Sequence, residues 1–302
     1  MDELSFDSNV KLLKINDLLE INDYFSEEVG LKLRNLITIL SKFLNKNVFI
    51  AYSGGIDSAF LAKIAFDALG ENAIAITGIS PSISKDEINS AQAIAKLIGI
   101  KHLLINTEEM QNENYTKNPI NRCYFCKTEL YSKILEHVKQ NGINLNDFVV
   151  LNGANYDDLS DFRPGQTAAS EKNVKSPLQE AKLTKDEIRI AAKLLHIPIW
   201  DKPASPCLSS RVANGEKISE QKLRKIEAAE KIIKELGINT VRVRSHAQEI
   251  ARIEVPKEYF EIIIKNYSSI AISFRKLGFS YVTLDLEGFR SGSLHMFKDL
   301  DE

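Results

Sequence analysis

The sequence predicts an α/β protein, with a doubly wound parallel sheet followed by a smaller C-terminal α+β domain. Short apolar runs such as "VFIAY" (48–52) are bounded by turn residues, which is typical of parallel strands buried on both faces. After Gly215 the pattern changes, and strands there alternate Val with Arg or Ile with Ala. The length of 302 residues, 44% hydrophobic and 26% charged, suits two globular domains.

Helical and strand patterns alternate through residues 31–155. The expected helices are 31–47, 59–70, one beginning near Ser84, and 126–142. The expected strands are 48–52, 72–79, 101–106 and 147–155. This alternation predicts the doubly wound parallel sheet. Residues 156–217 are less regular and rich in proline, with one clear helix at 184–196; irregular stretches of this length indicate function.

The last part of the chain shows a second pattern. Its expected elements are helix 218–237, strands 240–246 and 249–255, helix 256–277 and strand 281–286. They indicate a small α+β domain of ferredoxin-like type. We therefore expect an N-terminal arm (1–30), a main domain that carries the cysteines (31–214) and a domain for substrate binding or oligomerisation (215–302).

Charge and hydropathy exclude several classes of protein. The formal net charge is -2, from 39 basic and 41 acidic residues, which does not favour nucleic acid or membranes as partners. No apolar run approaches the ~20 residues of a membrane span. The N-terminal "MDELSFDSNVKLL" does not resemble a signal peptide, so we expect a cytoplasmic protein. In that compartment a metal, cluster or catalytic role for cysteine is favoured over a disulfide.

The segment "SGGIDS" (53–58) is the first candidate site. Gly54 and Gly55 permit close approach of an anion, and amides at the start of the following helix would hold it. Ser53 and Ser58 add hydroxyl donors, and Asp57 fits a magnesium ion that joins carboxylate to phosphate. The loop is neither a Walker A loop nor a dinucleotide fingerprint. A nucleotide triphosphate is favoured over the alternative, a simple strand-to-helix turn.

Three cysteines form the second candidate site: Cys123 and Cys126 in "NRCYFCK", and Cys207 in "ASPCLSSR". A zinc site would need a histidine, either His246 or His102. A persulfide relay would use one thiol as carrier and another as resolving thiol. Alternatively, the CxxC pair is merely packed at the start of a helix and Cys207 alone reacts.

The remaining candidate site residues lie near the end of the fourth expected strand or beyond it, and most of them are charged. We place Gly153 and Arg163 with the nucleotide, Arg163 on the departing pyrophosphate, and Asp158 on magnesium, because ligands bind at the carboxyl ends of parallel strands. Lys202 is expected to stabilise charge on the α-phosphate. Four arginines are candidates for binding the phosphate and carboxylates of a substrate: Arg211, Arg242, Arg244 and Arg252. The alternative for these four is an ordinary solvent-exposed strand face.

Two resemblances narrow the function. "SGGIDS" after a first strand resembles the PP-loop of the ATP pyrophosphatase superfamily, whose HUP-like domains cleave ATP between the α- and β-phosphates. The segments "DDLSDFRPG", "SPLQEA", "TKDEIR", "WDKPASPCLSSR", "RVRSH" and "ARIEV" resemble the LarE family, sulfur transferases of nickel-pincer cofactor synthesis. This resemblance runs from about Asn47 to Leu286.

The resemblance implies an ATP- and Mg²⁺-dependent enzyme that adenylates carboxylates of pyridinium-3,5-biscarboxylic acid mononucleotide and replaces oxygen by sulfur. In members with one cysteine, the residue matching Cys207 gives up its own sulfur. In a three-cysteine subtype, Cys123, Cys126 and Cys207 would hold a [4Fe-4S] cluster whose free iron carries sulfide from a donor. The resemblance also implies a homo-oligomer. The rivals are a tRNA-thiolating enzyme, for which no basic or RNA-binding module is evident, an amide-forming synthetase and a nucleotide-sensing module.

Overall fold

The computed structural model describes residues 12–20, 25–144, 146–160, 164–203 and 205–290. The chain forms two compact units. The first comprises Met1–Ser80, Lys85–Glu108 and Cys123–Ser205, and the second comprises Pro81–Ser84, Glu109–Arg122 and Pro206–Glu302. Cys207 thus belongs to the second unit, and the chain contributes to that unit three times. The domain bounds expected from the sequence do not coincide with these units and stay a prediction.

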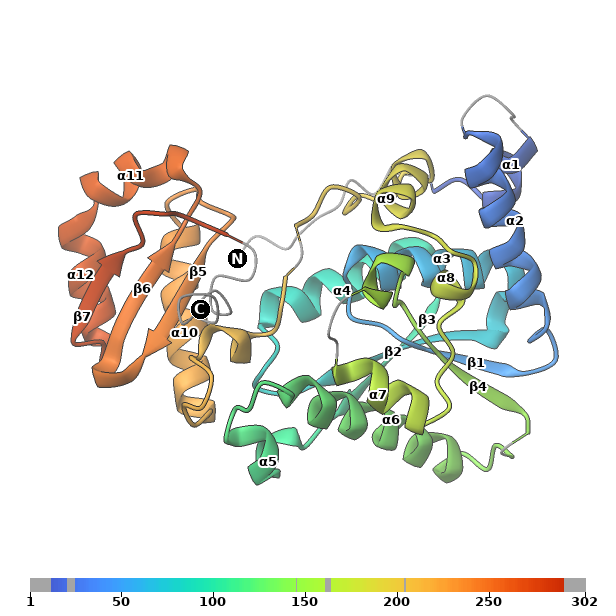
Figure 1. The fold of residues 1–302 in the computed structure, drawn as a ribbon, viewed down its shortest axis with the longest axis horizontal. Helices are drawn as coiled ribbons and strands as arrows, with labels where there is room; N and C mark the ends of the chain where they lie inside the picture. The colour runs from blue at the N-terminus through green and yellow to red at the C-terminus, as the bar shows by residue number, and fades with distance from the viewer. Residues whose placement is uncertain (1–11, 21–24, 145, 161–163, 204, 291–302) are drawn as a thin grey trace. The chain divides into compact units, whose positions relative to one another are not determined.

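Within the described residues, the first unit is built on a four-stranded parallel sheet in the order β3-β2-β1-β4 (Figure 1). The strands are β1 (Asn47–Ala51), β2 (Ala73–Ile79), β3 (Lys101–Asn106) and β4 (Phe148–Asn152). Ile50 of β1 lies opposite Ala75 of β2 and Leu151 of β4. Because β1 has a neighbour on each side and helices on both faces, its sequence is almost entirely apolar.

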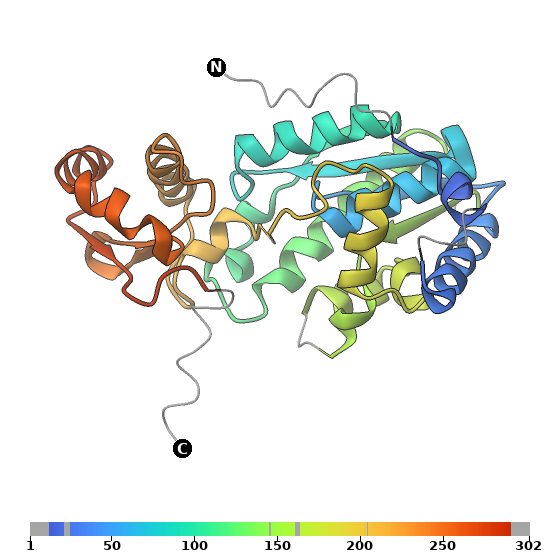
Figure 2. The same ribbon diagram turned by 90° about the horizontal axis from the view of Figure 1, so that it is seen from above.

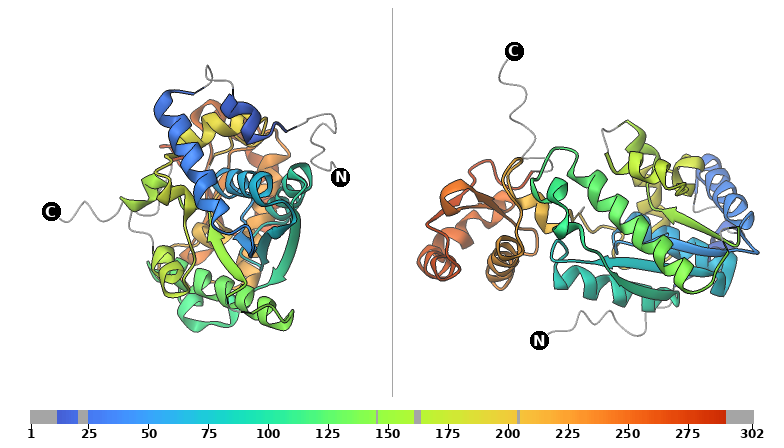
Figure 3. Two further views of the ribbon diagram at one scale, coloured as in Figure 1. Left: turned by 90° about the vertical axis from the view of Figure 1, so that its right-hand side faces the viewer. Right: turned by 90° about the horizontal axis from the view of Figure 1, so that it is seen from below.

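Apolar side chains of β1 alternate between the two faces of the sheet. Ile50 packs in the same core as α3 (Ile56–Leu69) and α4 (Lys85–Ile98), whereas Phe49 packs with α6 (Arg122–Gln140). The green helix α6 accordingly lies on the other face of the sheet from α3 and α4 (Figures 1 and 3). The predicted doubly wound arrangement is confirmed. The other described helices of this unit are α1 (Ile15–Glu20), α2 (Glu27–Ser41), α7 (Pro164–Glu171), α8 (Pro177–Glu180) and α9 (Lys185–Leu194).

The second unit contains, in its described part, a sheet in the order β5-β6-β7. Its strands are β5 (Arg242–His246), β6 (Ile250–Glu254) and β7 (Tyr281–Leu284); β5 and β6 are antiparallel, and β6 and β7 are parallel. Helices α10 (Glu220–Lys234) and α12 (Tyr267–Lys276) lie side by side against this sheet (Figure 2). This is the predicted α+β arrangement. The ferredoxin-like interpretation is wrong, because that βαββαβ fold needs four strands.

Several helix boundaries differ from expectation; α2, for example, is Glu27–Ser41 rather than 31–47. The predicted helix 256–277 is divided into α11 (Phe260–Lys265) and α12 by Asn266, whose φ of -102° and ψ of 15° are not helical. Its side-chain amide donates to the carbonyl of Ile262 at 2.8 Å, a local bond that competes with regular helix. Helix α6 begins at Arg122 rather than at residue 126, so the CxxC motif lies inside a helix.

Among the described residues, no helix combines the length and the apolar character that a membrane crossing requires.

A buried ion pair within α3 includes Asp67, which also binds the N-terminal helix α1. Lys63 Nζ lies 2.5 Å from Asp67 Oδ1 in α3, and only 4% and 7% of the two side chains are exposed. Asp67 Oδ2 also accepts the backbone N–H of Ile15, the first residue of α1, at 3.0 Å. Asp67 thus neutralises a buried ammonium group and holds α1 against α3.

We predict that Asp67→Ala lowers the free energy of unfolding by about 3–5 kcal/mol, because it leaves the Lys63 ammonium buried without a carboxylate. Urea denaturation followed by circular dichroism measures this change. The double variant Lys63→Met/Asp67→Leu serves as the control, because it removes both charges and should lose less stability than Asp67→Ala alone. The prediction fails if the single variant is the more stable of the two.

Candidate functional site

The loop Ser53–Ser58 connects β1 to α3 and is held by its own hydroxyl groups. The Ser58 hydroxyl donates to the carbonyl of Gly55 at 3.0 Å and accepts the backbone N–H of Ser53 at 3.2 Å. The Ser53 hydroxyl lies 3.1 Å from that of Ser58 and accepts the N–H of Gly55 at 3.3 Å. This network sets the backbone at the N-terminus of a 14-residue helix, where amide groups and the helix dipole favour an anion.

Two glycines allow backbone segments to meet around this loop. Gly54 has a φ of +73°, and a β-carbon there would lie 2.7 Å from the Cβ of Ala91 in α4. A β-carbon at Gly153, just after β4, would lie 2.8 Å from the backbone nitrogen of Ser58. Both distances are too short for a carbon atom. Gly153, expected to touch the nucleotide, therefore has a second role, which is to let β4 approach the start of α3.

Asp57 is bound by two residues from elsewhere in the chain. Its carboxylate forms an ion pair with Lys185 Nζ and accepts the side-chain amide of Asn155 at 3.2 Å. Lys185 is the first residue of α9, and its backbone N–H donates to Asp157 at 2.8 Å. A loop carboxylate that would otherwise repel phosphate is thus charge-compensated by an ammonium group.

Asp158 and Arg163, also expected here, have different positions. Asp158 is buried and its carboxylate caps the short 3₁₀-helix Tyr156–Leu159 by accepting the N–H of Asn155 at 3.0 Å. Asn155 therefore lies between Asp158 and Asp57. A direct bond from Asp158 to magnesium stays a prediction. Arg163 lies outside the described residues.

Lys202 pairs with a helix rather than with the loop. Its Nζ donates to Glu87 of α4 at 2.8 Å, and each side chain is 27% exposed. The Lys202 carbonyl accepts a guanidinium N–H of Arg189 at 3.3 Å. Its predicted contact with the α-phosphate stays a prediction.

The CxxC motif lies in the first turn of α6. Cys123 and Cys126 are three residues apart in a helix and therefore share one face. Cys123 is exposed and Cys126 is half-buried, and neither forms a disulfide. The alternative of simple core packing is therefore wrong for Cys123. Within the residues that the structure describes, no three His, Cys, Asp or Glu side chains are gathered as a metal site.

Cys207 immediately precedes the short helix η4 (Leu208–Arg211) and is a half-buried free thiol. Arg211 holds this turn: its guanidinium donates to the carbonyl of Pro206 and, at 3.3 Å, to that of Cys207. Its other side forms a buried ion pair with Glu230 of α10, with Nε 2.9 Å from Oε1. Arg211, expected to bind substrate, therefore binds the protein around Cys207.

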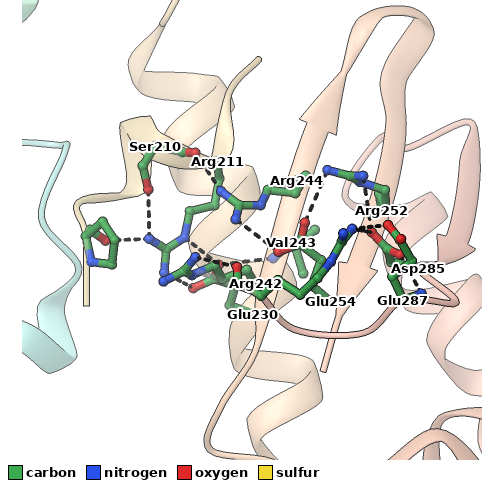
Figure 4. Close-up of polar contacts among 12 residues, drawn as sticks. Ser210, Arg211, Glu230, Arg242, Val243, Arg244, Arg252, Glu254, Asp285 and Glu287 are labelled. Carbon is green, nitrogen blue, oxygen red and sulfur yellow. Dashed lines mark hydrogen bonds and ion pairs between the residues drawn. The ribbon is translucent and has the colours of Figure 1, made fainter. Parts of the chain in front are cut away.

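The remaining arginines lie on the second unit's sheet (Figure 4). Arg244 of β5 is directly opposite Arg252 of β6, and Arg242 is opposite Glu254. Glu254 is fully buried and bridges two of them, 3.0 Å from Arg244 and 3.1 Å from Arg252. Arg252 also pairs with Asp285 at 3.1 Å. Arg242 and Arg244 are buried, so the alternative of a solvent-exposed strand face is wrong for these two.

Arg242 differs from its neighbours. Its guanidinium lies 4.5 Å from the ring centre of Phe289 and donates a long bond, 3.4 Å, to the carbonyl of Arg290. No carboxylate of the described residues forms an ion pair with it. Burial, together with the charges of Arg244 and Arg211, lowers the pKa of Arg242 to about 10. The guanidinium remains protonated at neutral pH, as a buried cation without a matched anion.

Comparison with known proteins agrees with this geometry. The NAD synthase family matches residues 32–134, which include the loop. An uncharacterized protein of Synechocystis sp. is 48% identical over 87% of this chain and 97% of its own length. The pyridinium-3,5-bisthiocarboxylic acid mononucleotide synthase of Lactiplantibacillus plantarum, a LarE protein, is 35% identical over 83% of this chain and 89% of its own length. An uncharacterized protein of Methanocaldococcus jannaschii is 34% identical over 86% and 97%.

The chain belongs to the LarE family. LarE proteins are PP-loop enzymes that use ATP, and the loop Ser53–Ser58 lies within the residues that the NAD synthase family matches. That this loop binds the nucleotide stays a prediction. The match to the synthase extends well beyond the residues matched by the NAD synthase family. The family therefore covers both the nucleotide loop and the region of the cysteines and arginines.

Three residues of this LarE-family chain were missed from sequence: Asn155, Lys185 and Glu230. Lys185 stands in "TKDEIR", which carries the resemblance, yet its charge partner Asp57 is 128 residues away. Asn155 stands three residues before Asp158, a residue that we expected to bind magnesium. Glu230 belongs to an ordinary charged helix, and only the packing of α10 against η4 and β5 reveals that it binds Arg211 and the N–H of Val243.

We predict that Gly153→Ala weakens ATP binding about 10- to 100-fold, because the new methyl group displaces the backbone of Ser58 and with it the loop. Calorimetric titration with a non-hydrolysable ATP analogue measures the affinity. Gly30→Ala in α2 is the matched control, since its β-carbon would approach nothing closer than 3.4 Å, and its affinity should equal that of the wild type. Equal affinities for all three proteins would contradict the prediction.

Proposed function

We propose that this chain is an ATP-dependent sulfur transferase that adenylates the carboxylates of pyridinium-3,5-biscarboxylic acid mononucleotide and replaces oxygen by sulfur. The observation that carries the proposal is its 35% identity with a synthase of the corresponding bisthiocarboxylic acid, extending over 83% of the chain. The glycine loop Ser53–Ser58 and three cysteines outside any disulfide, present in one chain, support the same reaction.

In the first step, a substrate carboxylate oxygen attacks the α-phosphorus of ATP and pyrophosphate leaves. Loop amides at the N-terminus of α3, with Ser53 and Ser58, would bind the phosphates. Asp57 would hold Mg²⁺, which supplies positive charge to the triphosphate when bound. In that event Lys185 would exchange its bond with Asp57 for one with a phosphate, so the loop keeps its charge balance.

In the second step, sulfide attacks the acyl-adenylate carbonyl carbon and AMP leaves, which yields a thiocarboxylate. AMP is a better leaving group than oxide, which is the chemical reason to join adenylation to sulfur transfer. We propose that Cys123, Cys126 and Cys207 hold a [4Fe-4S] cluster. None of the three is in a disulfide and each is at least partly exposed, and thiolates are the usual ligands of such clusters. When bound, the cluster would supply an iron that can hold sulfide. The predicted sulfide donor, homo-oligomer and cytoplasmic location stay predictions.

The first test measures pyrophosphate, thiocarboxylate product and iron together. After anaerobic reconstitution we expect about four irons per chain, lost in Cys123→Ala, Cys126→Ala and Cys207→Ala alike. Pyrophosphate release should persist in these variants, because the Ser53–Ser58 loop is unchanged, while thiocarboxylate formation stops. A wild-type protein that releases no pyrophosphate with ATP and this mononucleotide would overturn the proposed function.

The same experiment separates the two sources of sulfur. If no iron binds and the intact mass of the chain after turnover shows loss of hydrogen sulfide at Cys207, that residue is the sacrificial donor. Zinc in place of iron, with Cys207 intact, would contradict both sources.

We also propose that Arg242 binds an anionic group of the substrate. A buried guanidinium that is only weakly bonded within the protein is suited to accept a phosphate or carboxylate. Arg244 and Arg252 each form an ion pair with a carboxylate and are better described as the frame that supports Arg242.

We predict that Arg242→Met raises the KM for the mononucleotide at least about tenfold while leaving the KM for ATP unchanged. Its stability should equal or exceed that of the wild type, because a buried unmatched charge is removed. Arg252→Met is the contrasting variant: it leaves Glu254 and Asp285 without a shared partner and should lower the midpoint of thermal unfolding. An unchanged KM for the mononucleotide in Arg242→Met would remove Arg242 from the substrate site.

A further inference from the structure

A hydrogen bond joins a residue next to the CxxC motif to a residue near Cys207. Arg122 is the residue directly before Cys123 and the first residue of α6. One of its terminal nitrogens, Nη1, donates to the carbonyl of Ser209 at 3.0 Å, and Ser209 is the second residue after Cys207. The segment that enters the CxxC motif is thus tied to the turn that leaves Cys207.

Asn118 completes this connection and is fully buried. Its side-chain oxygen accepts the same Arg122 nitrogen at 2.5 Å. Its amide nitrogen donates to the carbonyls of Val212 at 3.2 Å and Ala213 at 2.7 Å. The backbone of Asn118 has a φ of +54°, a conformation that asparagine tolerates better than most residues. One end of the Asn118 side chain therefore holds Arg122, and the other end holds the segment after η4.

The chemistry of Arg122 indicates a geometric role. Only 9% of the residue is exposed, and the acceptors of its Nη1 are neutral oxygens rather than carboxylates. Burying a guanidinium on neutral acceptors costs desolvation free energy that a carboxylate partner would offset. A methionine or leucine would fill such a position at lower cost in free energy. The arginine is therefore explained by the two oxygen acceptors that its Nη1 holds together.

We infer that Arg122 and Asn118 are positioning residues for the thiols of Cys123, Cys126 and Cys207. The inference rests on the proposed function, in which the three thiols act together. Arg122 is adjacent to Cys123 in the sequence, and Ser209 is two residues after Cys207. The hydrogen bond between Arg122 and Ser209 is therefore close in sequence to both cysteine motifs. The connection raises the effective concentration of one thiol at the other and so favours a shared ligand.

The test measures how fast Cys207 forms a disulfide with Cys123 or Cys126 in the full chain. The reduced protein is freed of metal with a chelator, oxidised with diamide and digested, and disulfide-linked peptides are quantified by mass spectrometry. The Cys123–Cys126 disulfide is the internal reference, because both residues are in α6. We expect Arg122→Met to slow disulfides to Cys207 about tenfold relative to that reference. Arg275→Met, an exposed arginine of α12, is the control and should match the wild type.

Each outcome decides the inference. An unchanged ratio in Arg122→Met overturns it, as does a wild-type protein that forms no disulfide to Cys207. If Arg122→Met unfolds, Arg122→Lys carries the test: it retains the charge and can still reach one acceptor, so an intermediate rate supports positioning. Unfolding of both variants would make the role purely structural and overturn the inference. Pyrophosphate release, measured in parallel, tests the proposed function separately, because it depends on the Ser53–Ser58 loop rather than on the thiols.

Discussion

Close backbone approach around the nucleotide loop is the constraint on which the first unit depends. A β-carbon at Gly153 would lie 2.8 Å from Ser58, and one at Gly54 would lie 2.7 Å from Ala91. The end of β4 therefore meets the loop backbone directly, and the loop meets α4 with only the methyl group of Ala91 between them. Asn155, which follows β4, donates to Asp57 across this close approach. The glycines act on the loop through packing, and the polar contacts of Asp57 follow from that packing.

Charge compensation by distant residues recurs in both units and separates structural from functional charges. Asp57 is matched by Lys185, and Arg211 by Glu230. Glu254 serves two arginines that lie opposite each other across β5 and β6, a like-charge pair that would otherwise destabilise the sheet. Arg122 and Arg242 depart from this pattern, because neither forms an ion pair with a carboxylate of the described residues. Arg122 donates to two neutral oxygens, whereas Arg242 has one long bond to a carbonyl. A buried charge so weakly bonded is retained at a cost in stability, and for Arg242 this cost is the physical argument for a ligand.

Local patterns predicted the fold and the loop, while the partners of the site residues depend on long-range pairing. Period-two alternation and apolar runs are local, so the strands of the first unit were predicted within a few residues. The alternation of Val with Arg in β5 was equally visible, but its polar face is buried because Glu254 of β6 pairs with Arg244 and the ring of Phe289 lies against Arg242. The ion pair of Asp57 with Lys185 spans 128 residues and leaves no periodic signal. The break at Asn266 depends on one side-chain bond.

The turn at Cys207 is assembled from three separate segments of the chain. The carbonyl of Ser82 accepts the N–H of Leu208 at 2.8 Å, and the hydroxyl of Tyr115 lies 2.7 Å from that of Ser209. Arg122 adds its bond to the Ser209 carbonyl. Ser82 follows β2 and Arg122 begins α6, so both segments are continuous with elements of the first unit. The setting of the Cys207 thiol is therefore not a property of residues 206–302 alone, because residues 81–84 and 109–122 of the same unit also contribute to it.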